Sequence, residues 1–204
     1  KIVFHCSKVN SRLQNCVISR KQKQTMKIIA FAGSNSKNSI NRQVINKAAS
    51  FLSDNEVEIL DLRNFDAPIY SDVIEDKGIP ESILELRKRL NTADAFIIST
   101  PENNGFTTAF FKNILDWLSR LDRKTFGDKP VLFMSASPGG RAGQSVRENL
   151  AKLMPRWGAD IIVNYGIGNF NQKVVDGVWT HEAEKELRTQ VELFKSCLFK
   201  TEKA

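Results

Sequence analysis

Hydroxyl and amide side chains are concentrated in residues 33–41, between an apolar run and a predicted helix. The run at 28–32 lacks polar alternation, as expected of a strand covered on both faces, and Gly33 permits a sharp turn after it. Side chains of this segment that can donate hydrogen bonds include Ser34, Asn35, Ser36, Ser39 and Asn41. Free backbone N–H groups and a positive dipole end are added where the helix begins, near Asn41. The sequence therefore predicts a site for a phosphate monoester.

Two common phosphate motifs are absent from this segment. No Gly-Lys-Ser or Gly-Lys-Thr ends it, so it is not a Walker A loop, and Gly33 is not followed by the glycines of a dinucleotide fingerprint. ATP and a dinucleotide pyrophosphate are therefore disfavoured. The serines and asparagines are equally compatible with a purely structural role, capping a helix and filling a turn. This segment alone leaves both interpretations open.

Composition indicates one well-cored domain. The chain has 204 residues, of which 41% are hydrophobic, and no apolar stretch is long enough to cross a bilayer. The formal charge of +7 arises mostly in residues 1–25, which contain six basic residues and no acid. The other residues have 24 basic against 23 acidic side chains, a net charge of +1. We therefore expect no nucleic-acid partner.

Residues 1–25 require a separate interpretation because they do not begin with Met, whereas Met26 stands directly before the first predicted strand. We expect them to be an extension without a role in the fold, an organellar transit peptide being the alternative. The domain is predicted to span residues 26–204.

Cysteine and histidine usage excludes several chemistries. Cys6, Cys16 and Cys197 form no C-x-x-C pair, and His5 and His181 are the only histidines. A disulfide framework, a zinc site and a Ser-His-Asp triad therefore lack their parts. We expect a reducing, cytoplasmic compartment, no metal and no catalytic side chain.

Strands and helices alternate along the chain. Strands are predicted at about 27–32, 57–61, 93–100, 130–135 and 160–165. Helices are predicted at about 41–53, 80–91, 107–120, 143–155 and 181–199. This alternation predicts an α/β fold with a doubly wound five-stranded parallel sheet, in the order 2-1-3-4-5, and helices on both faces.

The predicted topology also locates a ligand site. In such sheets ligands bind beyond the carboxyl ends of the strands at the switch point, here between the first and third strands. The loops to consider are 33–41, 101–106 and 136–143. The second contains Pro101, Glu102, Asn103, Asn104 and Gly105, and the third contains Ser137, Pro138, Gly139 and Gly140. The small side chains of the third loop leave room for a flat ring against its backbone.

Four motifs in this order resemble the NADPH-dependent FMN reductases of flavodoxin-like fold, which include quinone, chromate and azo-dye reductases. They are GSNSKNSIN at 33–41, TPENNGFTTAFFKNILDWLSR at 100–120, KPVLFMSASPGGRAG at 129–143 and WGADI at 157–161. The resemblance implies that the first loop, with Ser34, Ser36, Ser39, Ile40 and Asn41, holds the FMN phosphate. It implies that residues 101–105 and 137–140 hold the isoalloxazine ring, and that the helix from Thr107 packs in a homodimer or homotetramer.

Two positions depart from the pattern of the family. Arg commonly stands where this chain has Ser36, and Tyr where it has Asn103. A charge-assisted phosphate contact is lost at the first position unless Lys37 or Arg42 replaces it. Asn103 can donate a hydrogen bond but cannot cover a ring as Tyr does.

The resemblance implies a ping-pong reaction in which FMN takes hydride from NADPH or NADH and reduces quinone-like or other small acceptors. Glu102 is then interpreted as a solvated loop charge, since hydride transfer needs no ionised partner there. Arg141 is a candidate for the 2′-phosphate of NADPH. Two alternatives stay open: a flavodoxin-type electron carrier to a protein partner, and a non-catalytic binding or scaffold protein. The long connection at 63–80 is a candidate cover for a partner subunit's flavin.

Overall fold

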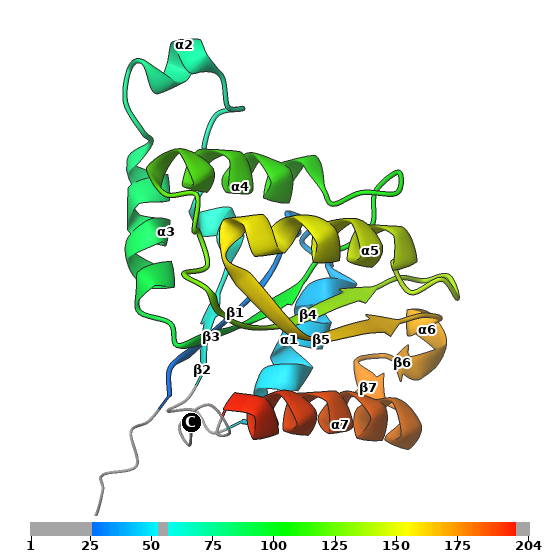
Figure 1. Ribbon diagram of the computed structural model, residues 1–204. Coiled ribbons are helices and arrows are strands. Elements are labelled where there is room, and N and C mark those ends of the chain that lie inside the picture. The colour runs from blue at the N-terminus through cyan, green and yellow to red at the C-terminus, as the bar shows by residue number, and fades with distance from the viewer. Residues whose placement is uncertain (1–25, 53–56, 199–204) are drawn as a thin grey trace, which may run out of the picture.

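Five parallel strands form the central sheet in the order β2-β1-β3-β4-β5, which confirms the predicted topology. The computed structural model describes residues 26–52 and 57–198 and is drawn in Figure 1. The strands are β1 (Ile28–Ala32), β2 (Val57–Leu60), β3 (Ala95–Ser99), β4 (Lys129–Ala136) and β5 (Ala159–Ile167). The predicted extension at 1–25 and the predicted domain end after residue 198 lie outside the described residues.

Helices cover both faces of the sheet, so the fold has three layers (Figure 1). On one face lie α3 (Glu81–Asn91), α4 (Ala109–Leu121) and α5 (Gln144–Leu153); on the other lie α1 (Ile40–Ala49) and α7 (His181–Leu198). Successive residues of β1 belong alternately to the two hydrophobic clusters, with Ile29 and Phe31 in one and Ile28 and Ala30 in the other. Burial on both faces explains the uninterrupted apolar run of this strand.

Some helices end earlier than periodicity predicts. The helix expected to reach residue 155 ends at Leu153 and is continued by a 3-10 turn, η2 (Met154–Trp157), which contains Pro155. Gly158 closes this turn in the left-handed region at φ 76°. A proline removes a backbone donor, and the tighter turn accommodates that loss.

Short elements that the sequence pattern did not predict lie in two connections. Between β2 and α3 are η1 (Leu62–Asn64) and α2 (Asp72–Glu75). Between β5 and α7 are α6 (Phe170–Lys173) and a small antiparallel hairpin of β6 (Val174–Val175) and β7 (Val178–Trp179). The turn of this hairpin, Asp176-Gly177, has positive φ at both residues, as a tight two-residue hairpin turn requires.

Strand β5 contains one irregularity. Val131 of β4 pairs with Ile161, whereas Leu132 pairs with Val163, so Ile162 is an extra residue in the ladder. Such a bulge shifts the alternation of side chains by one position. Accordingly Ile161 packs against the cluster under α3, α4 and α5, whereas Val163 belongs to the cluster under α1 and α7.

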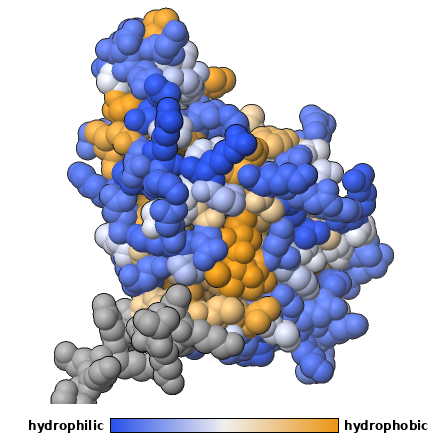
Figure 2. All heavy atoms as spheres, in the orientation of Figure 1, coloured by the Kyte–Doolittle hydropathy of each residue, from blue (hydrophilic) through white to orange (hydrophobic). Residues whose placement is uncertain are grey.

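The connection from β2 to α3, residues 61–80, is called the arm. Its part around α2 projects beyond the body of the domain (Figure 1), whereas Leu62 and Phe65 at its start are buried in the core. Trp117 Nε1 and Asn113 Nδ2 of α4 donate to the Pro68 carbonyl at 2.8 and 3.1 Å. Beyond that anchor Ile69 is 84% exposed and Val73 is 64% exposed. Apolar side chains are visible at this end of the molecule in Figure 2.

Among the helices of residues 26–52 and 57–198, none combines the length and the apolar character needed to span a membrane.

Candidate functional site

A cavity of about 310 Å³ opens at the carboxyl ends of β1, β3 and β4. Its walls come from all three loops that the topology singles out, and its lining contains no charged side chain. The lining residues are Ser34, Asn35, Ser36, Asn38, Ser39, Ile40, Asn41, Pro101, Asn103, Thr108 and Pro138. Of the predicted site residues, Glu102, Asn104, Gly105, Ser137, Gly139 and Gly140 lie in the same loops without lining this cavity.

The first loop leaves β1 through a close contact at Gly33. A Cβ atom at this position would lie 2.7 Å from the Phe111 ring and 2.8 Å from Thr100 Oγ1, so only glycine fits. The Thr108 hydroxyl donates to the Gly33 carbonyl at 2.8 Å, and the Gly33 N–H donates to the Ser99 carbonyl at 2.8 Å. These contacts fix the start of the loop against β3 and α4.

Each predicted serine of the first loop accepts a backbone hydrogen bond. Ser34 Oγ accepts from the N–H of Ser36 at 3.3 Å, and Ser36 Oγ accepts from the N–H of Asn38 at 3.3 Å. Ser39 Oγ caps α1 by accepting from the N–H of Arg42 at 3.2 Å. The capping interpretation is therefore correct for Ser39. Within the described residues the three hydroxyl protons have no acceptor, so each remains available to a ligand.

The start of α1 adds two backbone donors. No acceptor for the N–H groups of Ile40 and Asn41 lies within the described part of the chain, as is usual for the first turn of a helix. Together with the dipole of the ten-residue helix they favour an anion. This end of the cavity therefore combines hydroxyl and amide donors without a nearby lining carboxylate.

Arg42 is the cation beside this loop. Its Nη2 lies 3.4 Å from the Ser36 carbonyl oxygen and 3.7 Å from Asp61 Oδ1. The pKa of the Asp61 carboxyl is lowered, first by the hydrogen bond from Arg63 and further by the charge of Arg42. The guanidinium of Arg42 thus lies beside the Ser36 backbone, with part of its charge offset by Asp61.

The side chain of Asn41 is directed into the protein. Its Oδ1 accepts from Ser99 Oγ at 2.7 Å and from the Ala136 N–H at 2.9 Å, and its Nδ2 donates to the Ala136 carbonyl at 3.1 Å. Asn41 is only 1% exposed. The backbone N–H of Asn41 could therefore contact a phosphate, as predicted for this residue. Its side chain is already hydrogen-bonded to the ends of β3 and β4.

The second loop contains a tight hairpin. The Asn103 N–H donates to the Phe106 carbonyl at 2.8 Å, and the Phe106 N–H donates back at 3.0 Å. Asn104 and Gly105 occupy its tip with φ 51° and 80°, the geometry in which an Asn-Gly pair is favoured. The hairpin leaves Asn103 exposed at the cavity.

Helix α5 supports this hairpin through two contacts that sequence analysis missed. Glu102 Oε2 accepts from the Val146 N–H at 3.2 Å in the first turn of α5, and Asn149 Nδ2 donates to the Gly105 carbonyl at 3.0 Å. The interpretation of Glu102 as a solvated loop charge is therefore incomplete, because its carboxylate also caps a helix. Both partners lie 44 residues away in the sequence, so local spacing contains no signal for them.

The third loop is held by its own backbone. Ser137 Oγ donates to the Gly139 carbonyl at 2.8 Å, and the Asn169 N–H donates to the same carbonyl at 3.1 Å. A Cβ atom at Gly139 would meet nothing within 4 Å, whereas one at Gly140 would be in ordinary contact with Asn169. The space on the Cβ side of Gly139 is therefore open.

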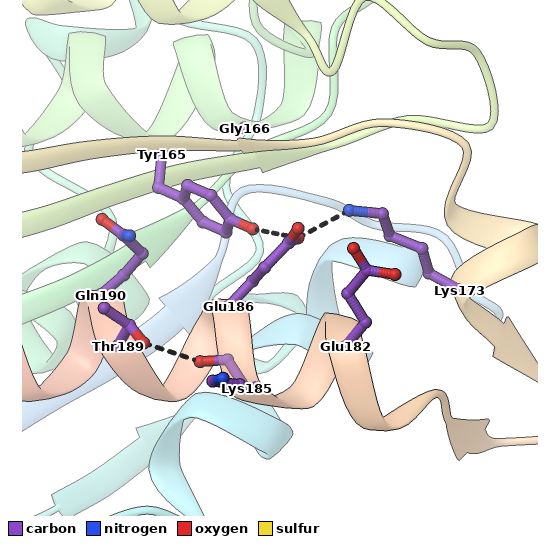
Figure 3. Close-up of a pocket in the computed structure, with 8 residues that line it drawn as sticks. All are labelled: Tyr165, Gly166, Lys173, Glu182, Lys185, Glu186, Thr189 and Gln190. Atoms are coloured by element: carbon purple, nitrogen blue, oxygen red, sulfur yellow. Dashed lines mark hydrogen bonds and ion pairs between the residues drawn. The ribbon is translucent and has the colours of Figure 1, made fainter.

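A second cavity, of about 600 Å³, lies away from these loops between β5, α6 and α7. Figure 3 shows Tyr165 and Lys173 both directed toward Glu186. Glu186 Oε2 accepts two hydrogen bonds, from the Tyr165 hydroxyl at 3.1 Å and from Lys173 Nζ at 2.7 Å. These groups satisfy one another and link the small hairpin region to α7. No group of three or more metal-ligating side chains is present in residues 26–52 and 57–198.

Two relatives are similar to this chain in sequence. The chain is 28% identical over 133 residues to an NAD(P)H-dependent FMN reductase of Pseudomonas aeruginosa, a match to 63% of this chain and 71% of that protein. It is 34% identical over 90 residues to a quinone reductase of Escherichia coli, covering 44% of this chain and about half, 48%, of the relative.

Solved structures support the fold. The flavoenzyme FerB, an NAD(P)H:(acceptor) oxidoreductase of Paracoccus denitrificans, superposes with a TM-score of 0.74 over 86% of this chain and 98% of its own, at 24% identity. The sequence profile described as NADPH-dependent FMN reductase matches residues 26–172, most of the chain. The chain therefore belongs to the NADPH-dependent FMN reductase family.

Proposed function

We propose that this protein is an NAD(P)H-dependent, FMN-containing oxidoreductase that reduces quinone-like or other small acceptors, or free flavin. The observation that carries the proposal is the set of unused donors around one end of the cavity. Ser34, Ser36, Ser39, Ile40 and Asn41 all line this cavity, and the three hydroxyls and the N–H groups of Ile40 and Asn41 donate to no acceptor within the described residues, which supports a phosphate site there.

The remaining loops suit the flat part of the same cofactor. Pro101 and Asn103 of the second loop and Pro138 of the third line the cavity together with the serines, and the backbone next to Pro138, at Gly139, is open. When bound, FMN supplies the hydride chemistry, taking hydride from a nicotinamide and passing electrons to an acceptor. The residues proposed to bind it are those named for the three loops above.

The protein's own contribution is binding and orientation. No cavity-lining side chain is titratable, so none can act as a general acid or base from the wall. The open space over Gly139 provides one face for both the nicotinamide and the acceptor. Sequential use of one face implies ping-pong kinetics.

An absorbance experiment tests the proposal. Protein beginning at Met26 is mixed with FMN, separated from free FMN, and treated anaerobically with NADPH and then with NADH. We expect bound flavin that bleaches with at least one nucleotide. Bound flavin that neither nucleotide bleaches would contradict the reductase and favour an electron carrier.

A protein that has kept the fold and lost tight flavin binding is the second candidate. It is favoured by one observation: neither an arginine nor an aromatic side chain lines the cavity, because Ser36 and Asn103 stand at those positions. A protein that carries no flavin absorbance after incubation with saturating FMN and removal of the free FMN would support this candidate.

We also propose that the protein forms a homodimer or higher homo-oligomer in the cytoplasm. Support for self-association comes from the arm at 61–80, which exposes Ile69 and Val73 beyond its anchor on α4.

A further inference from the structure

A single buried amide connects the bases of the three loops of the candidate site. Asn41 stands in the first turn of α1, directly after the serine loop. Its side chain binds Ser99, the last residue of β3, and Ala136, the last residue of β4. We propose that the Asn41 side chain is a positioning residue, which holds the two ring-binding loops at a fixed distance from the phosphate loop instead of contacting the phosphate. This inference rests on the proposed function.

The hydrogen-bonding capacity of the amide supports this role. Oδ1 has two lone pairs, and both are used by donors, Ser99 Oγ at 2.7 Å and the Ala136 N–H at 2.9 Å. One of the two Nδ2 protons is used by the Ala136 carbonyl at 3.1 Å. Little capacity remains for a ligand, and the residue is 1% exposed.

The backbone of Asn41 serves a different purpose from its side chain. Its N–H has no acceptor within the described residues and lies at the start of α1, where a phosphate would bind. Removing the side chain therefore leaves the phosphate donor in place. It leaves Ser99 Oγ and the two polar groups of Ala136 without their buried partner, which is costly.

The two possible roles of the Asn41 side chain, positioning the loops or contacting the phosphate, predict different effects on flavin binding. Ser99 precedes the hairpin loop, and Ala136 precedes the loop with Gly139. A shift of either loop should weaken binding of the ring, whatever is attached to it. Riboflavin has the ring and ribityl chain of FMN but lacks the phosphate, so it reports on the ring-binding loops alone.

The test measures dissociation constants for FMN and riboflavin in Asn41→Ala and in the unmodified protein. We expect both constants to rise by about tenfold, with their ratio unchanged. A rise for FMN alone would identify the side chain as a phosphate ligand and overturn the proposal. Unchanged constants for both flavins would also overturn it.

Ser36→Ala is the matched control. Ser36 lines the cavity and is exposed, and its hydroxyl proton is unused within the described residues. We expect this variant to weaken FMN binding and to leave riboflavin binding unchanged. Ser99→Ala is the milder variant if Asn41→Ala does not fold. It removes one of the three hydrogen bonds of Asn41 and should raise both constants by one smaller, equal factor.

Hydrogen exchange of the flavin-free protein gives a readout that needs no bound cofactor. We expect Asn41→Ala to speed exchange in residues 100–106 and 137–143 more than in the rest of α1. Exchange that rises only in α1 would contradict the positioning role. An unmodified protein that binds neither flavin would defeat the proposed function, while the exchange result would still decide the role of Asn41.

Discussion

At the scale of single residues, Gly33 and Gly139 differ in what surrounds them. A Cβ at Gly33 would lie 2.7 Å from Phe111, whereas one at Gly139 would meet nothing within 4 Å. We predict that Gly33→Ala destabilises the fold by about 1–3 kcal/mol through overpacking. Gly139→Val should change stability by less than about 0.5 kcal/mol and impair flavin reduction by filling the open surface. Urea unfolding and anaerobic NADPH reduction measure the two effects; an active Gly139→Val protein would contradict the placement of the ring.

Arg42 is the second residue with a specific prediction. Arg42 does not line the cavity, but its guanidinium is 3.4 Å from the Ser36 carbonyl, so we propose that it supplies the positive charge expected at that position. We predict that Arg42→Gln weakens FMN binding by about five- to tenfold, because a charge-assisted contact is lost. Riboflavin binding should not change. Lys37→Gln is the control: if it alone weakens FMN binding, Lys37 and not Arg42 supplies the charge.

At the scale of elements, helix α5 should determine the position of the Asn103 hairpin. Glu102 accepts from the Val146 N–H at 3.2 Å, so Glu102→Ala removes a helix cap and a hairpin brace together. We predict a loss of about 1 kcal/mol of stability and slower flavin reduction. Glu102→Gln keeps an acceptor oxygen and should restore most of both. Glu148→Ala, on an exposed part of α5, is the control and should leave reduction unchanged.

The contact between α7 and the small hairpin region should depend on pH. The hydrogen bond from Lys173, and then that from Tyr165, lowers the pKa of Glu186 below its usual 4.5. A lowered pKa in the folded state means that the stabilisation is complete above the unfolded value and is lost as pH falls through the folded value. We predict that Glu186→Gln reduces stability near neutral pH and that this loss is smaller at about pH 3, because the stabilisation falls as pH drops below 4.5 and through the lowered folded-state value.

Solvent exposure limits the size of this pH effect. The Glu186 side chain is 41% exposed, so we expect a difference below about 1 kcal/mol. Urea unfolding at the two pH values measures it, and Glu182→Gln on the same helix is the control. An equal loss at both pH values would show that packing and not charge makes the contribution.

Elements whose burial shows in consecutive residues could be predicted from the sequence. Runs such as residues 28–32 are apolar because both sheet faces are covered, so sequence alone indicates a buried parallel strand. The cap formed by Glu102 and the clamp formed by Asn41 depend on partners 44 and 95 residues away. Residue spacing carries no information on such partners. The hairpin of β6 and β7 was not predicted because each strand has only two residues, too few to show a periodic pattern of apolar side chains.

At the scale of the whole molecule, the arm at 61–80 is the surface proposed for self-association. Ile69 and Val73 are exposed there, although they are apolar. We predict that the unmodified protein is at least dimeric and that the double variant Ile69→Asp, Val73→Asp is monomeric, since it places two charges in the apolar contact. Analytical ultracentrifugation measures this. Val178→Asp is the control, because Val178 is 72% exposed on β7, outside the arm; an oligomeric double variant would exclude the arm.

The extra residue in β5, Ile162, shifts the alternation of side chains by one position in the second half of that strand. Leu132 pairs with Val163 only because Ile162 has been inserted before it, and Tyr165 and Ile167 follow in the same phase. Deleting Ile162 would remove the bulge and place Val163 directly after Ile161, so that Val163, Tyr165 and Ile167 keep their pairing with β4 and their face toward α7. In a strand without a bulge, such as β1, deletion of one residue would instead turn every following side chain to the opposite face. Deleting Ile162 should therefore be far less harmful than deleting one residue of β1.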